Sequence, residues 1–182
     1  KNVAPTFTTQ PAATATVAQN NTLALAYAAS DVDISDVVTL SQVAGQDLNG
    51  MTFNPATGAL SWVVGYDIAP GDYTVTIRAT DTNGASTDAT TVVTVTKTNR
   101  APAFDQELAD RNVAEGETIN FTYTATDADN DALTFTLTNP VQNAAITTAG
   151  VLTFAPEFAQ AGSTVTIGVT VTDVSGATDV TT

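Results

Sequence analysis

The sequence predicts an all-β protein built from two tandem antiparallel β-sandwich domains. Three observations carry this prediction: the chain repeats itself once, apolar and polar residues alternate within each copy, and 36 of the 182 residues are threonine. Threonine and valine are restricted at χ1 and favour strands over helices. Apolar residues make up 43% of the chain and charged residues only 13%, so the chain is expected to bury a core rather than to be disordered.

The repeat becomes visible when the sequence is aligned on itself. Residues 2–7 recur 97 positions later as residues 99–104, and residues 73–81 recur 92 positions later as residues 165–173. The offset decreases along the copy, which places short deletions in loops while the strand patterns stay in register. Ordered agreement of this length indicates a tandem repeat.

Within each copy, short segments alternate with a period of two. In residues 119–126, for example, Ile119, Phe121 and Tyr123 alternate with asparagine and threonine, which gives one face to a core and one to water. Turn signals such as Asn83-Gly84 separate these segments. We therefore expect about seven strands per copy, the number of an immunoglobulin-like antiparallel sandwich. The chain has no cysteine, so no disulfide joins the sheets.

The expected domains are residues 1–97 and 98–182, joined at residues 98–102, where Asn99 and Pro102 repeat the opening of the first copy. This linker is short, so the join is expected to be stiff. Thr182 aligns with Thr90, and the second domain is therefore expected to lack most of its last strand, the counterparts of residues 91–97. Either the chain was cut there, or a strand from another subunit fills the gap.

Composition excludes several classes of function. The net charge of −14 argues against nucleic acid as a partner, and no apolar run is long enough for insertion in a membrane. The chain has no histidine and no cysteine, which removes imidazole triads, thiol nucleophiles and the usual zinc ligands. The sequence is therefore expected not to be an enzyme.

Four stretches, all present in a fixed order, resemble a known family: residues 53–62, 77–84, 99–104 and 125–131. With these residues the chain resembles bacterial cadherin-like and immunoglobulin-like tandem repeats of large surface proteins. The resemblance implies an extracellular or cell-surface location, a place in a longer array, and calcium bound near the joins between domains.

An acidic cluster in each copy fits calcium on its own chemistry. Calcium takes six to eight oxygen ligands, several of them carboxylates, and Asp127, Asp129 and Asp131 supply three carboxylates within five residues. An EF-hand loop is excluded, because Ala132 and Thr138 stand where it needs glycine and glutamate. The alternative is that these aspartates form only polar turns.

The resemblance adds further ligands to each cluster and places them at one pole of the domain. The implied ligands are Asn99, Asp127, Asp129 and Asp173 in the second copy, and Asn2, Asp31, Asp33 and Asp81 in the first. A glutamate that serves the following join in cadherins matches Glu115, but Gln19 stands there in the first copy. A single calcium ion is therefore expected at the join between the two copies.

The function expected from these observations is a non-catalytic structural or adhesive segment of a large extracellular protein with calcium-stiffened joins. Two alternatives stay open: spacer or glycan-binding modules of a secreted carbohydrate-active enzyme, and a self-assembling surface filament subunit. The partners would be neighbouring repeats of the same chain, a glycan or cell-surface ligand, or like subunits bound through an open strand edge.

Overall fold

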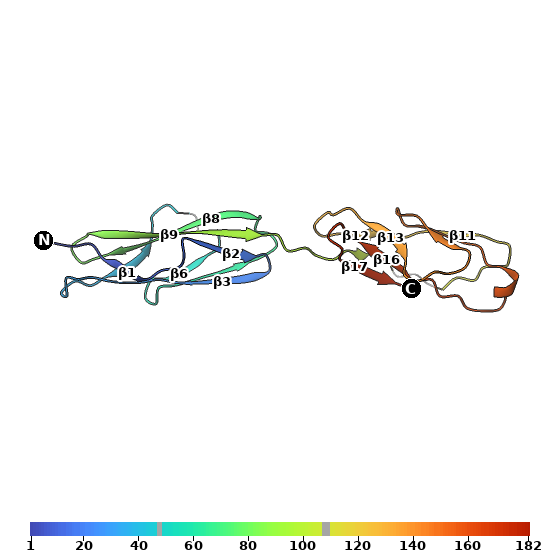
Figure 1. Ribbon diagram of the computed structural model, residues 1–182, viewed down its shortest axis with the longest axis horizontal. Coiled ribbons are helices and arrows are strands. Elements are labelled where there is room, and N and C mark those ends of the chain that lie inside the picture. Colours follow the sequence, from blue (N-terminus) through green and yellow to red (C-terminus); the bar gives the residue numbers. More distant parts are fainter. Residues whose placement is uncertain (47–48, 107–109) are drawn as a thin grey trace. The chain divides into compact units, whose positions relative to one another are not determined.

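The computed structural model describes residues 1–46, 49–106 and 110–182. The chain divides into two compact units, Lys1–Thr98 and Asn99–Thr182, called domain 1 and domain 2 below (Figure 1). Apart from one 3-10 turn, η1 (Phe158–Gln160), the regular structure of the described residues consists of β-strands, which confirms the all-β prediction. None of the described segments is a helix of the length and apolarity needed to cross a bilayer.

Domain 1 forms two layers of strands. In the first layer β1 pairs with β4, and β7 lies between β3 and β6; in the second the order is β2-β9-β8-β5. The strands are β1 (Thr6–Thr9), β2 (Thr14–Ala18), β3 (Asn21–Ala26), β4 (Ala28–Ser30), β5 (Thr39–Gln42), β6 (Thr52–Asn54), β7 (Ala59–Val64), β8 (Gly71–Thr80) and β9 (Ser86–Thr96).

These nine strands arise from about seven predicted ones because two strands are interrupted. Only Tyr27 separates β3 from β4; its backbone N–H donates to the carbonyl of Gly58 in the register of β3 and β7, but the Gly58 N–H donates to Asn54 and gives no bond in return. The first strand is also split: β1 pairs antiparallel with β4, whereas β2 crosses to the other layer and pairs parallel with β9. This is the one parallel pair among the described strands.

Domain 2 repeats the same topology, with β2 as the strand that has no counterpart among the described residues. Its pairings are β10-β12, β11-β15-β14 and β13-β16-β17. The strands are β10 (Ala103–Phe104), β11 (Ile119–Thr122), β12 (Ala125–Thr126), β13 (Thr134–Leu137), β14 (Ala144–Ile146), β15 (Val151–Phe154), β16 (Val169–Thr172) and β17 (Thr178–Thr181).

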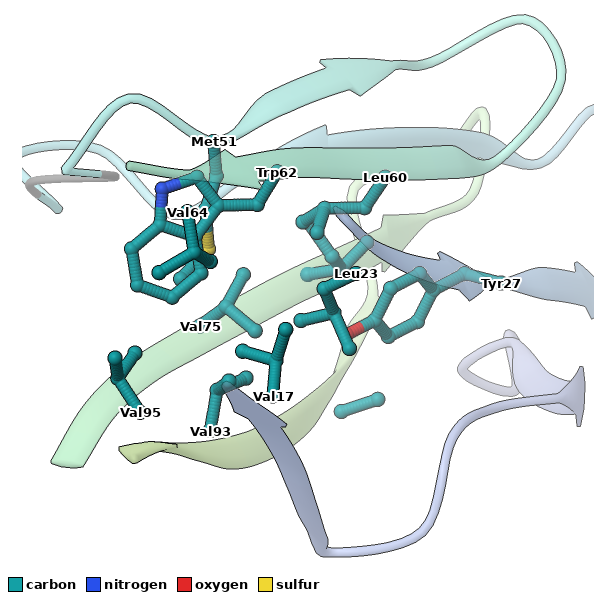
Figure 2. Close-up of a cluster of buried hydrophobic side chains, with 12 residues drawn as sticks. Val17, Leu23, Tyr27, Met51, Leu60, Trp62, Val64, Val75, Val93 and Val95 are labelled. Carbon is teal, nitrogen blue, oxygen red and sulfur yellow. The ribbon is translucent and has the colours of Figure 1, made fainter. Parts of the chain in front are cut away.

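The core of domain 1 follows from strict alternation along its strands. On β7, Leu60, Trp62 and Val64 point inward and are at most 1% exposed, while the residues between them are exposed (Figure 2). The Trp62 ring packs edge-on against Tyr73, with ring centroids 5.0 Å apart. Trp62 is thus a core residue and has no face open for stacking on a sugar.

The core of domain 2 is smaller. Its cluster of buried side chains comprises Tyr123, Phe135, Leu152, Val169 and Val171. The corresponding cluster of domain 1 has twelve members, among them Val93 and Val95 from the second half of β9.

Candidate metal centres

The polar residues at one end of domain 2 are positioned by the ends of its strands. Asp127 directly follows β12, and Asp173 directly follows β16. Asn99 lies three residues before Pro102, the residue that precedes β10. Because β10 runs antiparallel to β12, the start of one strand lies beside the end of the other. This end is called the domain 2 pole and is made of Asn99, Arg100, Asp127, Asp129, Asp131 and Asp173.

Each of two aspartates uses one oxygen to close its own turn. Asp127 Oδ1 accepts hydrogen bonds from the backbone N–H groups of Asp129 (2.7 Å) and Asp131 (3.2 Å). Asp173 Oδ1 accepts from the backbone N–H groups of Ser175 (2.8 Å) and Ala177 (2.9 Å). The local sequence therefore folds into Asx turns, as the polar-turn alternative requires, but these turns use only one oxygen of each carboxylate.

Two other oxygens at the pole are left without a hydrogen-bond donor. Asn99 Nδ2 donates to Asp173 Oδ2 at 2.7 Å, which leaves Asn99 Oδ1 free to accept. Asn99 Oδ1 and Asp127 Oδ2 are both buried, and neither accepts a hydrogen bond from the described residues. Carboxylate oxygens of Asp127, Asp129 and Asp131 lie within 4.8 Å of one another. Buried acceptors without donors are rare and costly, and a hard cation satisfies such a set of oxygens.

Arg100 binds the remaining predicted ligand, Asp129. Its backbone N–H donates to Asp129 Oδ2 at 2.7 Å, and its Nε (3.1 Å) and Nη2 (2.8 Å) donate to Oδ1. Nη2 also donates to the Ala128 carbonyl. The Asp129 side chain is only 7% exposed, so Arg100 places a positive charge beside a nearly buried carboxylate. Sequence reasoning missed Arg100, although it is one of only five basic residues and directly follows Asn99.

Related contacts recur at the domain 1 pole, made of Asn2, Val3, Asp31, Asp33, Asp36, Asp81 and Asn83. Asn2 Nδ2 donates to Asp81 Oδ2 at 2.8 Å, as Asn99 does to Asp173. Asp31 Oδ1 accepts from the backbone N–H of Asp33 at 2.7 Å. Asp31 Oδ2 is buried and has no hydrogen-bond partner among the described residues. The implied ligands of each copy therefore gather at one end of their own domain.

The domain 1 pole differs from the domain 2 pole in what surrounds the carboxylates. Val3 stands at the position of Arg100 and gives Asp33 only its backbone N–H, at 3.0 Å. Asn83 Nδ2 donates to both oxygens of Asp36 (3.0 and 2.9 Å) and to Asn2 Oδ1 (3.3 Å). Ser175 is the counterpart of Asn83 in domain 2. The Asn83 amide therefore donates to Asn2 Oδ1, whereas Asn99 Oδ1 has no donor among the described residues.

Asp36 is a second residue that sequence reasoning missed. Carboxylate oxygens of Asp31, Asp33 and Asp36 lie within 4.8 Å of one another, as those of the three domain 2 aspartates do. The offset of 96 places Ser35, not Asp36, opposite Asp131, because this loop is one residue longer in domain 1. The sequence did carry a signal for Asp36, since it is the third aspartate within six residues.

One aspartate at each pole, Asp81 and Asp173, has a pKa below the ordinary range of aspartate. Burial raises the pKa of Asp81, but the hydrogen bonds from Asn2 and from the backbone N–H groups of Ala85, Asn83 and Gly84 together outweigh it, so the pKa is lowered. For Asp173 the hydrogen bond from Asn99 is the largest cause; it lowers the pKa, burial opposes it, and backbone N–H groups add to the lowering. Both carboxyl groups are therefore ionised at neutral pH.

Gln19, which stands in domain 1 at the position of Glu115, has a structural role. It is 5% exposed, and its Nε2 donates to the carbonyls of Tyr66 (3.3 Å) and Ile68 (2.7 Å). Its Oε1 accepts from the backbone N–H of Thr98 at 3.2 Å, and its backbone carbonyl accepts from Thr98 Oγ1 at 2.8 Å. Gln19 thus binds the last residue of domain 1, while Asn99 and Arg100 are bound within domain 2.

Comparisons with known proteins agree with this architecture. A family model described as a putative Ig domain matches residues 4–96, and one described as a bacterial Ig domain matches residues 99–182. Over 108 residues the chain is 33% identical to Cadherin-99C of Drosophila melanogaster; the match covers 56% of this chain and only 6% of that protein.

Solved structures of cadherin domains share the fold. The structure of human Protocadherin-24 EC1-2 has a TM-score of 0.52 and 16% identity, with 100% of this chain and 93% of that chain covered. The structure of human CDH23 EC21-23 has a TM-score of 0.55 and 18% identity, with 98% and 62% covered. At these identities the likeness shows the fold alone.

Proposed function

The chain belongs to the putative Ig domain family, and with a bacterial Ig domain following in tandem we propose that it is a non-catalytic structural or adhesive segment of a large extracellular surface protein, whose domain poles bind calcium. Tandem Ig- and cadherin-like domains are consistent with an extracellular structural or adhesive segment. Families of this kind are generally non-catalytic. The bacterial description of the second domain supports a bacterial source.

The observation that carries the calcium proposal is the pair of buried, donor-free oxygens at the domain 2 pole. Asn99 Oδ1 and Asp127 Oδ2 would hold the ion, with Asp131 beside them. At the domain 1 pole Asp31, Asp33 and Asp36 would do the same. When bound, calcium supplies two positive charges to clusters in which carboxylates otherwise repel each other. Asp81 and Asp173 would act indirectly. Each accepts a hydrogen bond from the asparagine at the start of its own domain and so orients that asparagine.

The linker contacts support a role of the ion in stiffening the join. Thr98 is bound by Gln19 in domain 1, and the next two residues, Asn99 and Arg100, are bound by aspartates in domain 2. Calcium held by Asn99 would fix the linker further onto domain 2. We expect bending between the domains to decrease as a result.

The alternative of glycan-binding modules has weaker support. Trp62, the one tryptophan of the chain, is 1% exposed and cannot stack on a sugar ring. A glycan-array screen of the chain separates the two functions: clear glycan binding would favour the accessory-module alternative over the structural segment.

The experiment for calcium is thermal unfolding and small-angle scattering of the whole chain, in millimolar calcium and in chelator. Binding to the folded state alone stabilises it by about 2.7 kcal/mol when free calcium is 100 times the Kd. We expect calcium to raise the unfolding temperature of domain 2. We also expect it to narrow the distribution of interatomic distances that scattering gives, because the join bends less.

Two variants serve as controls for that experiment. Asp127→Asn removes one carboxylate from the domain 2 pole and is expected to abolish the shift in domain 2. Glu117→Ala removes an exposed carboxylate from the turn before β11, and its calcium response is expected to match that of the unaltered chain. If calcium changes neither measurement, or if the two variants respond alike, the proposal of a calcium site is wrong.

A further inference from the structure

The domain 1 pole has an open hollow beside its acidic turn. The hollow encloses about 560 Å³, and carboxylates and aliphatic side chains line it together, including Val32, Asp33, Ile34 and Asp36. The lining also includes one basic residue, Lys1. All of these residues belong to domain 1. The hollow is thus mainly acidic and aliphatic.

Four aliphatic side chains are exposed at this pole. Val32 is 72% exposed, Ile34 is fully exposed, and Val3 and Val37 are 46% and 67% exposed. Aliphatic side chains gathered in water at one end of a domain indicate a surface that a partner covers. A join between repeats does not account for them, because domain 2 directly follows another domain and has no large aliphatic side chain at the matching positions. The matching residues are Arg100, Ala128, Asn130 and Ala132.

The acidic turn of domain 1 has the same hydrogen bonds as its counterpart in domain 2. In each turn the backbone N–H of the second aspartate, Asp33 or Asp129, donates to Oδ1 of the first aspartate at 2.7 Å. In each, the backbone N–H of the residue at the start of the domain, Val3 or Arg100, donates to Oδ2 of the second aspartate, at 3.0 and 2.7 Å. Asp33 and Asp129 are therefore held in the same way.

In domain 2 the Arg100 guanidinium fills two further acceptors of this turn. Its Nε and Nη2 donate to Asp129 Oδ1 at 3.1 and 2.8 Å, and Nη2 also donates to the Ala128 carbonyl. The matching acceptors in domain 1 are Asp33 Oδ1 and the Val32 carbonyl, and no described residue donates a hydrogen bond to either of them. Domain 1 therefore has both acceptors for a guanidinium but does not supply the guanidinium itself.

We propose that the domain 1 pole is a docking site for another protein, which inserts an arginine. The guanidinium donates to Asp33 Oδ1 and to the Val32 carbonyl, and aliphatic side chains beside this arginine cover Val32 and Ile34. Arginine fits better than lysine, because two acceptors of one turn match its planar set of donors. The acidic charge of the pole attracts such a partner. This role goes beyond the proposed calcium site and does not depend on it.

A second copy of this chain fits the site less well than a different, basic protein does. Two copies carry a net charge of −14 each and repel each other. The three arginines of the chain also have partners within their own domains. These pairs are Arg78 with Asp88, Arg100 with Asp129, and Arg111 with the Phe121 ring.

The test is a titration of the whole chain, in chelator, with a capped tripeptide of valine, arginine and leucine, followed by the NMR signals of the backbone amides. We expect saturable shifts in residues 31–37 and none in residues 127–131. Citrulline, which is neutral and nearly the same shape, should replace arginine only with a loss of affinity of about tenfold or more, and lysine should also bind less tightly. Equal affinities of the three peptides, or no saturable shift, would overturn the proposal.

Three variants locate the guanidinium. Val3→Arg supplies a guanidinium from the chain itself, as Arg100 does in domain 2, and is expected to abolish binding although both acceptors remain. Asp33→Asn should weaken binding by about tenfold or more, whereas Asp36→Asn removes an equal charge from the same hollow and should weaken it by less than about threefold. Unchanged binding by Val3→Arg would overturn the assignment. Equal losses in the two asparagine variants would also overturn it, because net charge alone would then attract the peptide.

A fourth variant tests the aliphatic part of the surface. Ile34→Asn introduces the residue that domain 2 has at this position. It should weaken binding of the tripeptide more than binding of capped arginine alone, because only the tripeptide has aliphatic side chains to place on Ile34. An equal effect on both ligands would show that the aliphatic side chains are not part of the docking site.

Sedimentation of the chain without peptide tests the other occupant. The chain is expected to remain monomeric, and its signals in residues 31–37 are expected not to change with its concentration. If it associates and these signals shift, the occupant is a second copy, and the assignment to a different protein is wrong.

Discussion

Domain 1 and domain 2 share one topology but differ at their poles. In domain 1 an uncharged residue, Val3, lies beside the aspartates of the pole and gives Asp33 only its backbone N–H. In domain 2 Arg100 stands at that position and neutralises part of the pole. The contacts that close the Asp81 and Asp173 turns are the same in both domains, so the repeat preserves these local turns better than it preserves the charge around them.

This difference separates two kinds of residue in a repeated fold. Residues that close a turn through their own backbone, such as Asp81 and Asp173, are needed wherever the turn occurs. Residues that face a neighbour or a ligand vary with the position of the domain in the chain. The four predictions below test this separation, beginning with the largest expected effect.

The first prediction compares matched core residues on β7 and β15. Trp62→Ala should destabilise domain 1 by about 3–5 kcal/mol, because the ring is fully enclosed. Phe154→Ala should cost domain 2 less, because Phe154 lines a groove of about 580 Å³ that is open to solvent, and part of the space that the ring leaves joins this groove. Urea unfolding followed domain by domain measures both, with the exposed Val63→Ala as a control expected to change stability by less than about 0.5 kcal/mol. An equal loss in both domains would contradict the comparison.

The second prediction concerns two glycines that approach the backbone of a tyrosine. A Cβ on Gly58 would lie 1.8 Å from the Tyr27 carbonyl oxygen, and one on Gly150 would lie 2.6 Å from that of Tyr123; both glycines have positive φ. Gly58→Ala should therefore cost about 3 kcal/mol and Gly150→Ala less. Gly84→Ala, also at positive φ but with no atom within 4 Å of its Cβ, should cost least. Chemical denaturation gives the ranking, and a reversed order of Gly58 and Gly150 would contradict it.

The third prediction exchanges the residues that distinguish the two poles. Arg100→Val should destabilise domain 2 by about 1–3 kcal/mol in chelator, because the nearly buried Asp129 then loses its guanidinium donors. The same variant should bind calcium more tightly at the domain 2 pole, while Val3→Arg should weaken binding at the domain 1 pole. Calorimetric titration with calcium measures the affinities. Unchanged affinities in both variants would show that the guanidinium does not compete with the ion.

The fourth prediction, with the smallest effect, concerns pH. The pKa values of Asp81 and Asp173 are lowered on folding, so the stability they contribute is fully present above the unfolded pKa of about 3.9 and is lost as the pH falls through the folded pKa. Asn99→Ala should therefore destabilise domain 2 at pH 7 but progressively less below about pH 4.

The matched variant Asn2→Ala should change the pH dependence of domain 1 in the same direction. Burial raises the pKa of Asp81, and the hydrogen bond from Asn2 is the largest of the causes that lower it, as the hydrogen bond from Asn99 is for Asp173. Unfolding curves between pH 2 and 7 measure both variants. A pH dependence unchanged by Asn2→Ala would contradict the comparison.

The alternation of the sequence was sufficient to predict the sandwich. On β7 every second residue is apolar, and these residues are the buried ones. The interruption at Tyr27 could not be predicted, since it depends on Gly58, 31 residues away, whose N–H donates to Asn54 and not back to Tyr27. The parallel pairing of β2 could not be predicted either, because a short threonine- and alanine-rich strand carries no signal of the direction of its partner.

The candidate sites were predictable to the extent that they are local. The Asp-x-Asp turns lie next to strand ends, and the repeat aligns Asn2 with Asn99, which made both of them predictable. Arg100 lies 29 residues from Asp129, and only the pairing of β10 with β12 brings them together. Asp36 escaped because one inserted residue shifts the alignment within its loop.

The parallel pairing of β2 with β9 has a mechanical consequence. These strands lie near the two ends of domain 1 and run in the same direction, so a pull on those ends draws them apart along their length. The five register pairs between Thr14–Ala18 and Val92–Thr96 then share the load in shear and do not open one after another. Under tension applied at its two ends, domain 1 would therefore resist extension until all five pairs separate together.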